Sequence, residues 1–106
     1  MSNFKLYSQY YDLLYKDKDY VSEAEYVIKL AQRYKKNCTK FLELGCGTGN
    51  HAAILCKNGF EVLGLERSAE MVNIASQKNI ANFKPSVADI TNFSLNEKFD
   101  VAVSLF

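Results

Sequence analysis

The first third of the chain carries apolar residues at helical spacing. Residues 8–16 (SQYYDLLYK) fit a short helix, and a second helical stretch runs from about 20 to 36. One face of this second stretch carries the residues that we expect to be buried: Ala24, Val27, Ile28, Ala31 and Tyr34. Ser22 and Glu25 have the spacing of a capping box, which predicts that the first turn frays or that the helix begins late.

Beyond residue 39 the pattern changes to short apolar runs separated by helical segments. The runs predict strands over 40–44, 61–65, 83–88 and 99–106. Two helices are expected between them, one over 50–58 that ends at Gly59 and one from a cap at Ser68 to about residue 78. Pro85 lacks an N–H group, so the third strand must begin near it or lie at an edge of the sheet.

Strands that alternate with helices indicate an α/β fold, a Rossmann-like doubly wound parallel sheet with helices on both faces. The strands are continuous apolar runs, which is typical of strands covered on both sides. We expect one domain, with N-terminal helices over 1–36 and a Rossmann-like core of about four strands over 40–106. The final run, VAVSLF, stops within a strand. Because natural sheets avoid bare apolar edges, we expect a sheet truncated after the fourth strand or covered by a second copy.

Composition narrows the classes of partner. Thirteen basic and twelve acidic residues leave a net charge of +1, so neither nucleic acid nor a membrane surface is indicated. The chain lacks a run that could span a bilayer and lacks the apolar core of a signal peptide, and a cytoplasmic location is expected. Cys38, Cys46 and Cys56 fit no metal-ligand spacing, so we expect reduced thiols and no metal site.

The stretch ELGCGTGN places Gly45, Gly47 and Gly49 between the first strand and its helix. Glycines let a ligand approach the main chain, and the N–H groups of the following helix favour a negative group. The spacing differs from the dinucleotide fingerprint G-x-G-x-x-G, because Asn50 occupies the last position. Glu43, two residues before the turn, favours a ligand that also carries an ammonium group. The turn therefore predicts an anionic or zwitterionic ligand.

Two further acids follow the next strands. Glu66 ends the second strand, 21 residues after Gly45, where an acid can accept two hydrogen bonds from a ribose diol. The alternative is a solvated loop carboxylate. Asp89 follows the third strand and could meet an adenine amino group, or it could cap the turn at Thr91 or Asn92.

Together these residues resemble the class I S-adenosylmethionine-dependent methyltransferases. FLELGCGTG resembles the first motif of that family, VLGLERSAEM the second, SVADI the third and FDVAVSLF the fourth, in the family's order over 40–106. The resemblance implies S-adenosyl-L-methionine as cofactor. Glu43 and the turn Gly45–Gly49, Cys46 included, would hold its methionine end, and Glu66 would bind the ribose hydroxyls.

The resemblance also implies the adenine contacts. Met71 would lie against the adenine face, and Asp89 and Ile90 would meet its edge. Arg67 is counted with them as a cofactor-binding position. The family more often has an apolar residue there, so the Arg67 side chain could instead point to solvent.

The N-terminal stretch YYDLLYKDKDYVSEAEYV is similar to the opening of small-molecule methyltransferases, including enzymes that methylate amino groups of nucleotide-linked sugars. In that group the first helix folds over the cofactor. Tyr11 and Tyr15 would then face the methionine end, where aromatic rings attract a sulfonium cation. The alternative is that both tyrosines only pack this helix onto the sheet.

No catalytic base is assigned. Methyl transfer from a sulfonium needs mainly proximity and an in-line approach, and in this family the acceptor contacts come largely from segments after the fourth strand. His51 begins a helix, so we expect its backbone N–H to matter more than its ring. Cys46 is expected to be a small turn residue, and Asp100 begins its strand and is expected to be structural.

The sequence thus predicts the cofactor-binding part of a methyltransferase that acts on a small-molecule acceptor, with an amino group as the expected acceptor atom, and that is inactive alone. One alternative is an NAD(P)-binding oxidoreductase fragment that uses the turn for a pyrophosphate. Another is a non-catalytic cofactor-binding or assembly fragment, a homodimer through its fourth strand.

Overall fold

The computed structural model describes residues 19–89 and 97–105 of the chain. The elements over this range follow the predicted order: α2 (Tyr20–Tyr34), β1 (Lys40–Leu44), α3 (Asn50–Lys57), β2 (Glu61–Glu66), α4 (Ala69–Gln77), β3 (Phe83–Val87) and β4 (Val101–Ser104). The predicted α/β class is confirmed. The predicted helix over 8–16 lies outside the described residues. The last strand begins two residues later than expected.

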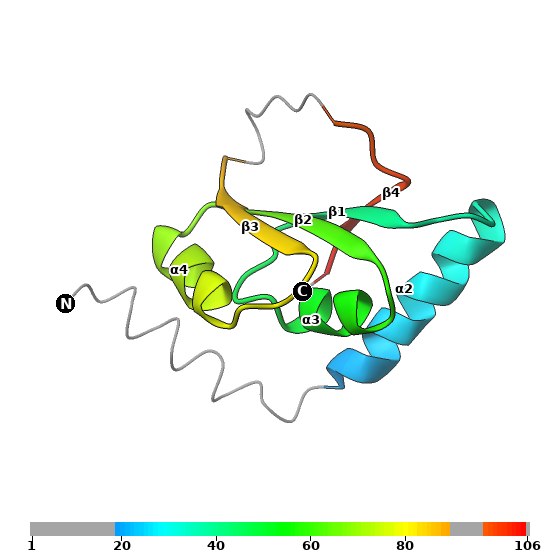
Figure 1. Ribbon diagram of the computed structural model, residues 1–106, viewed down its shortest axis with the longest axis horizontal. Coiled ribbons are helices and arrows are strands. Elements are labelled where there is room, and N and C mark those ends of the chain that lie inside the picture. The colour runs from blue at the N-terminus through cyan, green and yellow to red at the C-terminus, as the bar shows by residue number, and fades with distance from the viewer. Residues whose placement is uncertain (1–18, 90–96, 106) are drawn as a thin grey trace.

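The strands form one parallel sheet in the order β3-β2-β1-β4 (Figure 1). The chain moves outward from β1 to β3 and then returns to add β4 on the other side of β1. The strand order therefore reverses at β1, and the carboxyl end of this strand opens onto the crevice where α/β sheets bind ligands. Pro85 lies in β3 at an edge of the sheet, as its missing N–H requires.

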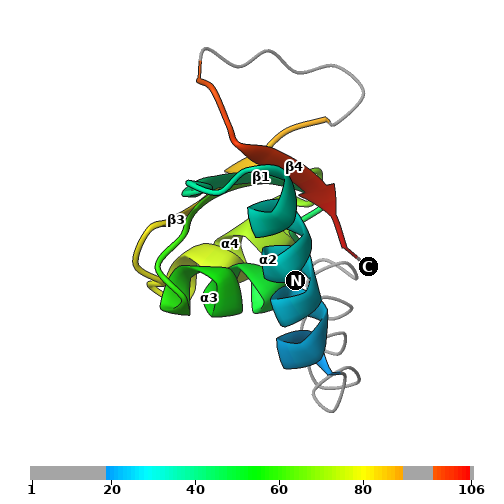
Figure 2. The same ribbon diagram turned by 90° about the vertical axis from the view of Figure 1, so that its right-hand side faces the viewer.

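All helices that the structure describes lie on one face of the sheet (Figure 2). The expectation of helices on both faces is therefore wrong for this part of the chain. The steps from β1 to β2 and from β2 to β3 run in one direction, and right-handed crossovers then place α3 and α4 on the same side.

The two faces of the sheet carry different apolar clusters. On the helix face, Phe41 and Val62 are buried with residues of α2 and α3, and Phe41 meets Phe60 edge to face at 5.1 Å between ring centroids. On the other face, Leu42, Leu63 and Leu65 are buried, with Ala88 and Phe99 packed against them. The central strands are thus covered on both sides, as their continuous apolar runs predict.

Helix α2 begins where the sequence predicts, but its cap and the exposure of its last turn differ from the prediction. Asp19, not a capping box, starts α2, because its carboxylate accepts a hydrogen bond from the Ser22 N–H at 3.0 Å. The helix begins at Tyr20, as predicted, and the alternative of a late start is wrong. Ala24 and Ala31 are buried as expected, whereas Tyr34 is 85% exposed, so its predicted burial is wrong.

Asp100 holds the amino ends of β1 and β4 together. Its carboxylate forms an ion pair with Lys35 and accepts backbone hydrogen bonds from Thr39 at 2.8 Å and Lys40 at 3.0 Å. The Lys35 ammonium and these two N–H groups hold the pKa of Asp100 well below its usual range. Asp100 is structural, as its position before the strand predicts.

Replacing Asp100 with Asn should lower the thermal unfolding midpoint at neutral pH. Folding lowers the pKa of this carboxyl. Its contribution to folding stability is therefore complete above its pKa in the unfolded chain, roughly 3.9, and is lost as the pH falls further toward its pKa in the folded chain. The gap between wild type and Asp100→Asn should therefore narrow below about pH 4. Glu97→Gln, which loses an exposed pair with Lys40 at 2.6 Å, is the control for a smaller effect. A gap that stays constant down to about pH 3 would contradict this role.

Gly64 lies in β2 beside Glu43 of β1 and leaves no room for a side chain. A Cβ atom at this position would lie 2.6 Å from the Cys46 sulfur and 2.8 Å from the Phe83 ring. The turn after β1 and the first residue of β3 therefore both depend on a bare backbone here.

Gly64→Ala should destabilise the chain by about 1 to 3 kcal/mol through overpacking, measured by urea unfolding. Gly59→Ala is the matched control, because the space around Gly59 is open and its φ of +94° makes the cost one of backbone strain alone. The change Cys46→Ala removes the sulfur that a side chain at position 64 would meet. Combined with Gly64→Ala it should therefore recover part of the lost unfolding free energy, whereas combined with Gly59→Ala it should recover none. Equal recovery in both backgrounds would refute the packing explanation.

Candidate functional site

The glycine turn connects β1 to α3 at the carboxyl end of β1, one of the two interior strands. Gly45, Gly47 and Gly49 have φ values of +70°, +57° and +91°, which residues with side chains rarely adopt. The N–H groups of Gly45 and Cys46 both donate to the Leu65 carbonyl, at 2.7 and 3.2 Å, and this anchors the turn on β2. The predicted need for glycines in this turn is confirmed.

Gly49 also brings the start of α3 close to β3. A Cβ atom at Gly49 would lie 2.8 Å from the Phe83 ring, which lies at the first position of β3. This is the close helix–strand approach that the third glycine of such turns permits. The role of Phe83 was not predicted, since nothing in the sequence marks an aromatic residue at an edge strand as a neighbour of the turn.

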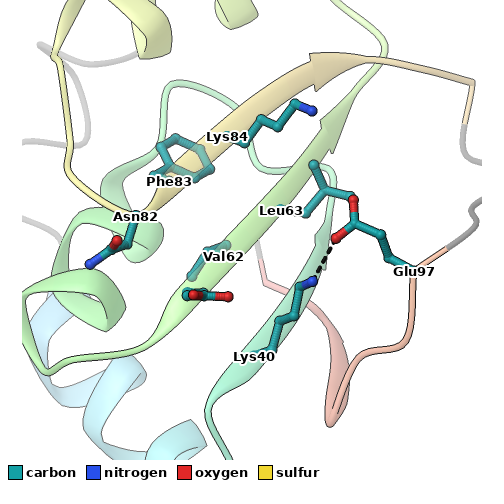
Figure 3. Close-up of a pocket in the computed structure, with 8 residues that line it drawn as sticks. Lys40, Val62, Leu63, Asn82, Phe83, Lys84 and Glu97 are labelled. Atoms are coloured by element: carbon teal, nitrogen blue, oxygen red, sulfur yellow. Dashed lines mark hydrogen bonds and ion pairs between the residues drawn. The ribbon is translucent and has the colours of Figure 1, made fainter.

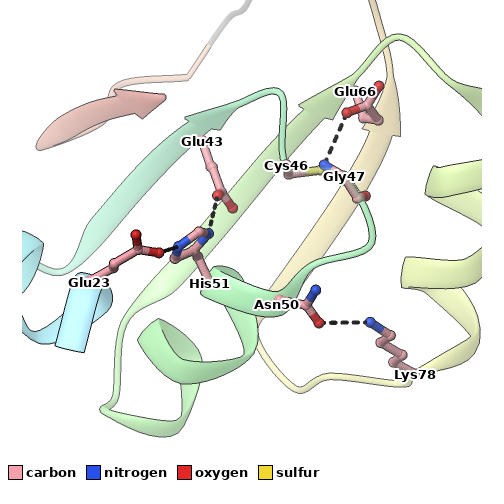
Figure 4. Close-up of polar contacts among 8 residues, drawn as sticks. All are labelled: Glu23, Glu43, Cys46, Gly47, Asn50, His51, Glu66 and Lys78. Carbon is pink, nitrogen blue, oxygen red and sulfur yellow. Dashed lines mark hydrogen bonds and ion pairs between the residues drawn. The ribbon is translucent and has the colours of Figure 1, made fainter. Parts of the chain in front are cut away.

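Glu66 joins the glycine turn to the start of α4 (Figure 4). One carboxylate oxygen accepts a hydrogen bond from the Gly47 N–H at 3.0 Å, and the other accepts one from the Ser68 N–H at 2.9 Å. The Ser68 hydroxyl in turn caps α4 by accepting from the Met71 N–H at 3.1 Å, as predicted. The Glu66 carboxylate retains lone pairs, so it could still accept hydrogen bonds from hydroxyl groups.

Glu43 is a buried carboxylate at the end of β1. It is 1% exposed, and its Oε1 atom has no hydrogen-bond partner among the described residues. Burial raises the pKa of Glu43 to about 8, and the nearby negative charge of Glu66 adds to the shift. A buried carboxyl with an unsatisfied oxygen is costly, so a cationic or donor group of a ligand would be favoured here.

The His51 ring lies beside Glu43, in contacts that the sequence pattern did not predict. The ring is buried, with Nε2 at 2.8 Å from the Glu23 carboxylate of α2 and Nδ1 at 3.9 Å from the Glu43 carboxylate (Figure 4). The Tyr20 ring meets it edge to face at 4.9 Å. The contact with Glu23 spans 28 positions of sequence, so no local pattern predicts it.

Cys46 is buried in the turn. Burial, followed by the charges of Glu43 and Glu66, raises the pKa of its thiol to about 12. A thiol with a pKa this high is a poor nucleophile at neutral pH. This agrees with its expected role as a small residue in the turn.

The remaining predicted residues fall into two groups. Met71 is buried, with its sulfur 3.9 Å from the position that a Cβ of Gly47 would take, whereas Arg67 and Asp89 are exposed at the carboxyl ends of β2 and β3. Tyr11, Tyr15 and Ile90 lie outside the described residues. The structure therefore brings the glycine turn, Glu43, Glu66 and Met71 to one edge of the sheet.

Of two hollows in the described surface, one lies at the carboxyl ends of the strands, where the glycine turn is, and the other lies at their amino ends. One, of about 440 Å³, lies at the start of α4 and is lined by Glu66, Arg67, Ser68, Ala69 and Glu70. The other, of about 280 Å³, lies at the opposite end of the sheet, because Lys40, Glu61 and Phe83 on its wall are the first residues of their strands (Figure 3). Lys40 and Glu97 pair across it at 2.6 Å, so its facing charges are already matched.

The described residues hold no group of three or more His, Cys, Asp or Glu side chains that could bind a metal ion. Within the same ranges, no helix has the length and apolar character needed to cross a bilayer.

Several known proteins are similar to this chain in sequence or in structure. A dTDP-3-amino-3,4,6-trideoxy-alpha-D-glucopyranose N,N-dimethyltransferase of Streptomyces venezuelae is 33% identical over 98 residues, which cover 91% of this chain and 41% of that protein. A SAM-bound amino pentose methyltransferase from Micromonospora echinaspora has a TM-score of 0.82 and 26% identity, with 91% of this chain and 41% of that one covered. The plantazolicin methyltransferase, solved with SAH, has a TM-score of 0.74 and 26% identity over 92% of this chain and 39% of its own.

The chain spans about two fifths of the length of the curated relatives it matches. The cofactor expected from the sequence is the one that these structural neighbours carry, as SAM or SAH. None of these comparisons favours an oxidoreductase. Residues 41–106, the part that holds the glycine turn and Glu66, match the family described as a methyltransferase domain, and the chain belongs to that family.

Proposed function

We propose that this chain binds S-adenosylmethionine at the carboxyl ends of β1 and β2 and is the cofactor-binding part of a methyltransferase. The observation that carries the proposal is the pair of acids around the glycine turn. Glu43 offers a buried carboxylate with an unsatisfied oxygen, and Glu66 offers a partly exposed carboxylate already fixed by two N–H groups. One acid suits the ammonium of a methionine end, and the other suits a ribose diol.

Different residues of the chain would contact different parts of the cofactor. The glycine turn and the start of α3 would hold the methionine carboxylate through main-chain N–H groups, with Glu43 against the ammonium. Met71 would contact the adenine, and Arg67, Asp89, Ile90, Tyr11 and Tyr15 stay predictions as further contacts. When bound, the cofactor supplies an electrophilic methyl group, and these residues orient it for in-line attack.

The acceptor is proposed to be the amino group of a small molecule. Two of the relatives act on amino sugars linked to dTDP, and one structural neighbour is an amino pentose methyltransferase. Because the chain spans about two fifths of such relatives, we propose that turnover needs further polypeptide to complete the acceptor site. The cytoplasmic location and the absence of nucleic acid and membrane partners stay predictions from the sequence.

A nicotinamide dinucleotide fits this turn less well. Its pyrophosphate would bring negative charge beside the Glu66 carboxylate, and it carries no cationic group for the buried Glu43 oxygen that has no partner among the described residues.

Glu66→Gln should weaken the binding of S-adenosylhomocysteine by roughly tenfold, or about 1.4 kcal/mol, in a calorimetric titration. The amide keeps the shape of the side chain but cannot accept from two N–H groups and from ribose hydroxyls as a carboxylate does. Glu61→Gln is the matched control, since Glu61 is an exposed acid at the other end of the same strand and should bind as the wild type does.

Two results would count against the cofactor assignment. One is equal weakening in Glu66→Gln and Glu61→Gln. The other is saturable binding of NADH that NAD displaces and S-adenosylhomocysteine does not.

We also propose that the chain forms a homodimer through β4. This strand is at an edge of the described sheet, and beside it lies an apolar groove of about 280 Å³ whose walls include Val27, Leu30 and Val103. Ala102→Lys places a charge on the exposed side of this edge and should shift the species seen by light scattering from dimer to monomer. Ser76→Lys on the exposed side of α4 is the control, and a monomeric wild type would refute the proposal.

A further inference from the structure

Glu23, His51 and Glu43 form a line of polar side chains from the partly exposed Glu23 on α2 to the buried end of β1 (Figure 4). Exposure falls along this line, from 42% for the Glu23 side chain to 7% for His51 and 1% for Glu43. The His51 ring lies between the two carboxylates, at 2.8 Å from Glu23 and 3.9 Å from Glu43. The line therefore connects solvent to the carboxyl that the glycine turn surrounds.

We propose that His51 is a positioning residue for Glu43: held by Glu23, its ring fixes the buried carboxylate that faces the cofactor's ammonium group, and the Glu43–His51 pair releases a proton when that group binds. The inference rests on the proposed function. It adds a role for His51 and Glu23 and a proton linkage to the binding step.

The surroundings of Glu43 explain why a proton would leave. Glu66 adds negative charge, and the thiols of Cys46 and Cys56 are buried nearby without offsetting it. Tyr20 and Glu23 reach the pair from α2 through the His51 ring. The described ion pairs place the His51 ring against Glu43, at 3.9 Å. An ammonium group supplies a positive charge from outside and favours the ionised carboxylate.

The pKa of Glu43 determines whether ligand binding releases or takes up a proton. In the free chain this pKa is raised to about 8, so near neutral pH the carboxyl is mostly protonated. A bound ammonium lowers the pKa, so binding releases a proton at pH values below about 8 and releases progressively less above it. Affinity should accordingly rise with pH up to about 8 and then level off.

The His51 ring also offers the proton a route out of the core. An imidazole can accept a proton at one nitrogen and donate one from the other. Nδ1 faces buried Glu43, and Nε2 contacts the partly exposed Glu23. Because Nδ1 is 3.9 Å from the Glu43 carboxylate, beyond hydrogen-bond distance, proton transfer along this route requires the ring and the carboxyl to approach first.

The first test titrates wild-type chain with S-adenosylhomocysteine in two buffers of different ionisation enthalpy. The buffer takes up any released proton, so the difference in binding heat between the two buffers gives the number of protons released. We expect about one proton per ligand at pH 6.5 and a small fraction of one at pH 8.5. 5′-Methylthioadenosine lacks the amino and carboxyl groups of the methionine end, so its binding should release none. Saturable binding of S-adenosylhomocysteine without proton release at pH 6.5 would overturn the inference, and this comparison needs no variant.

The second test separates positioning from a general structural effect. His51→Gln loses the nitrogen that faces Glu43 and should bind S-adenosylhomocysteine roughly tenfold more weakly, with 5′-methylthioadenosine affected less than twofold. His51→Asn keeps a polar atom near Nδ1 and should recover part of the loss. Lys57→Ala, at an exposed position at the other end of the same helix, is the control.

The outcomes distinguish the two proposals. If S-adenosylhomocysteine and 5′-methylthioadenosine lose affinity equally in His51→Gln, the ring only supports the fold, and the inference is wrong while the cofactor assignment stands. If the wild type binds neither ligand, the cofactor assignment fails, and the inference fails with it.

Discussion

Glu43 places a carboxyl group where water does not reach, and the poor solvation of its charged form links the elements around the site. The strand that carries it, β1, pairs on both of its edges, so its end cannot move to solvent without disrupting the pairing with β2 and β4. The glycine turn, the His51 ring and the Glu66 carboxylate are arranged around this fixed point. A buried group that is costly in the free chain becomes favourable when a ligand brings the opposite charge, and this favours a zwitterion over a simple anion.

The order of the elements and the glycine turn could be predicted because both depend on short-range patterns. Apolar periodicity gave the positions of the helices and strands, and alternate glycines marked the turn. Periodicity also shows which side of a helix faces inward, but it does not show how far the neighbouring element extends. Tyr34, in the last turn of α2, therefore matches the buried pattern and is nonetheless exposed.

The contacts that were missed join residues that are distant in sequence. The His51 ring meets Glu23 across 28 positions. The requirement for glycine at position 64 comes from Cys46 and Phe83, which lie on either side of β2. The coverage of a single sheet face follows from the direction in which the strands are added. Each of these features arises only when the sheet is assembled, so composition and local spacing do not predict it.

The Asp100 carboxylate also bears on the order in which the sheet assembles. Strands β1, β2 and β3 and the helices between them are contiguous in the sequence, so each can pair soon after it is synthesised. By contrast, Asp100 meets Thr39 across 61 positions, so β4 must close a long loop before it gains any contact. Long-range parallel pairing of this kind is slow. β4 is therefore expected to join last, and the crevice beside β1 is completed only in that final step.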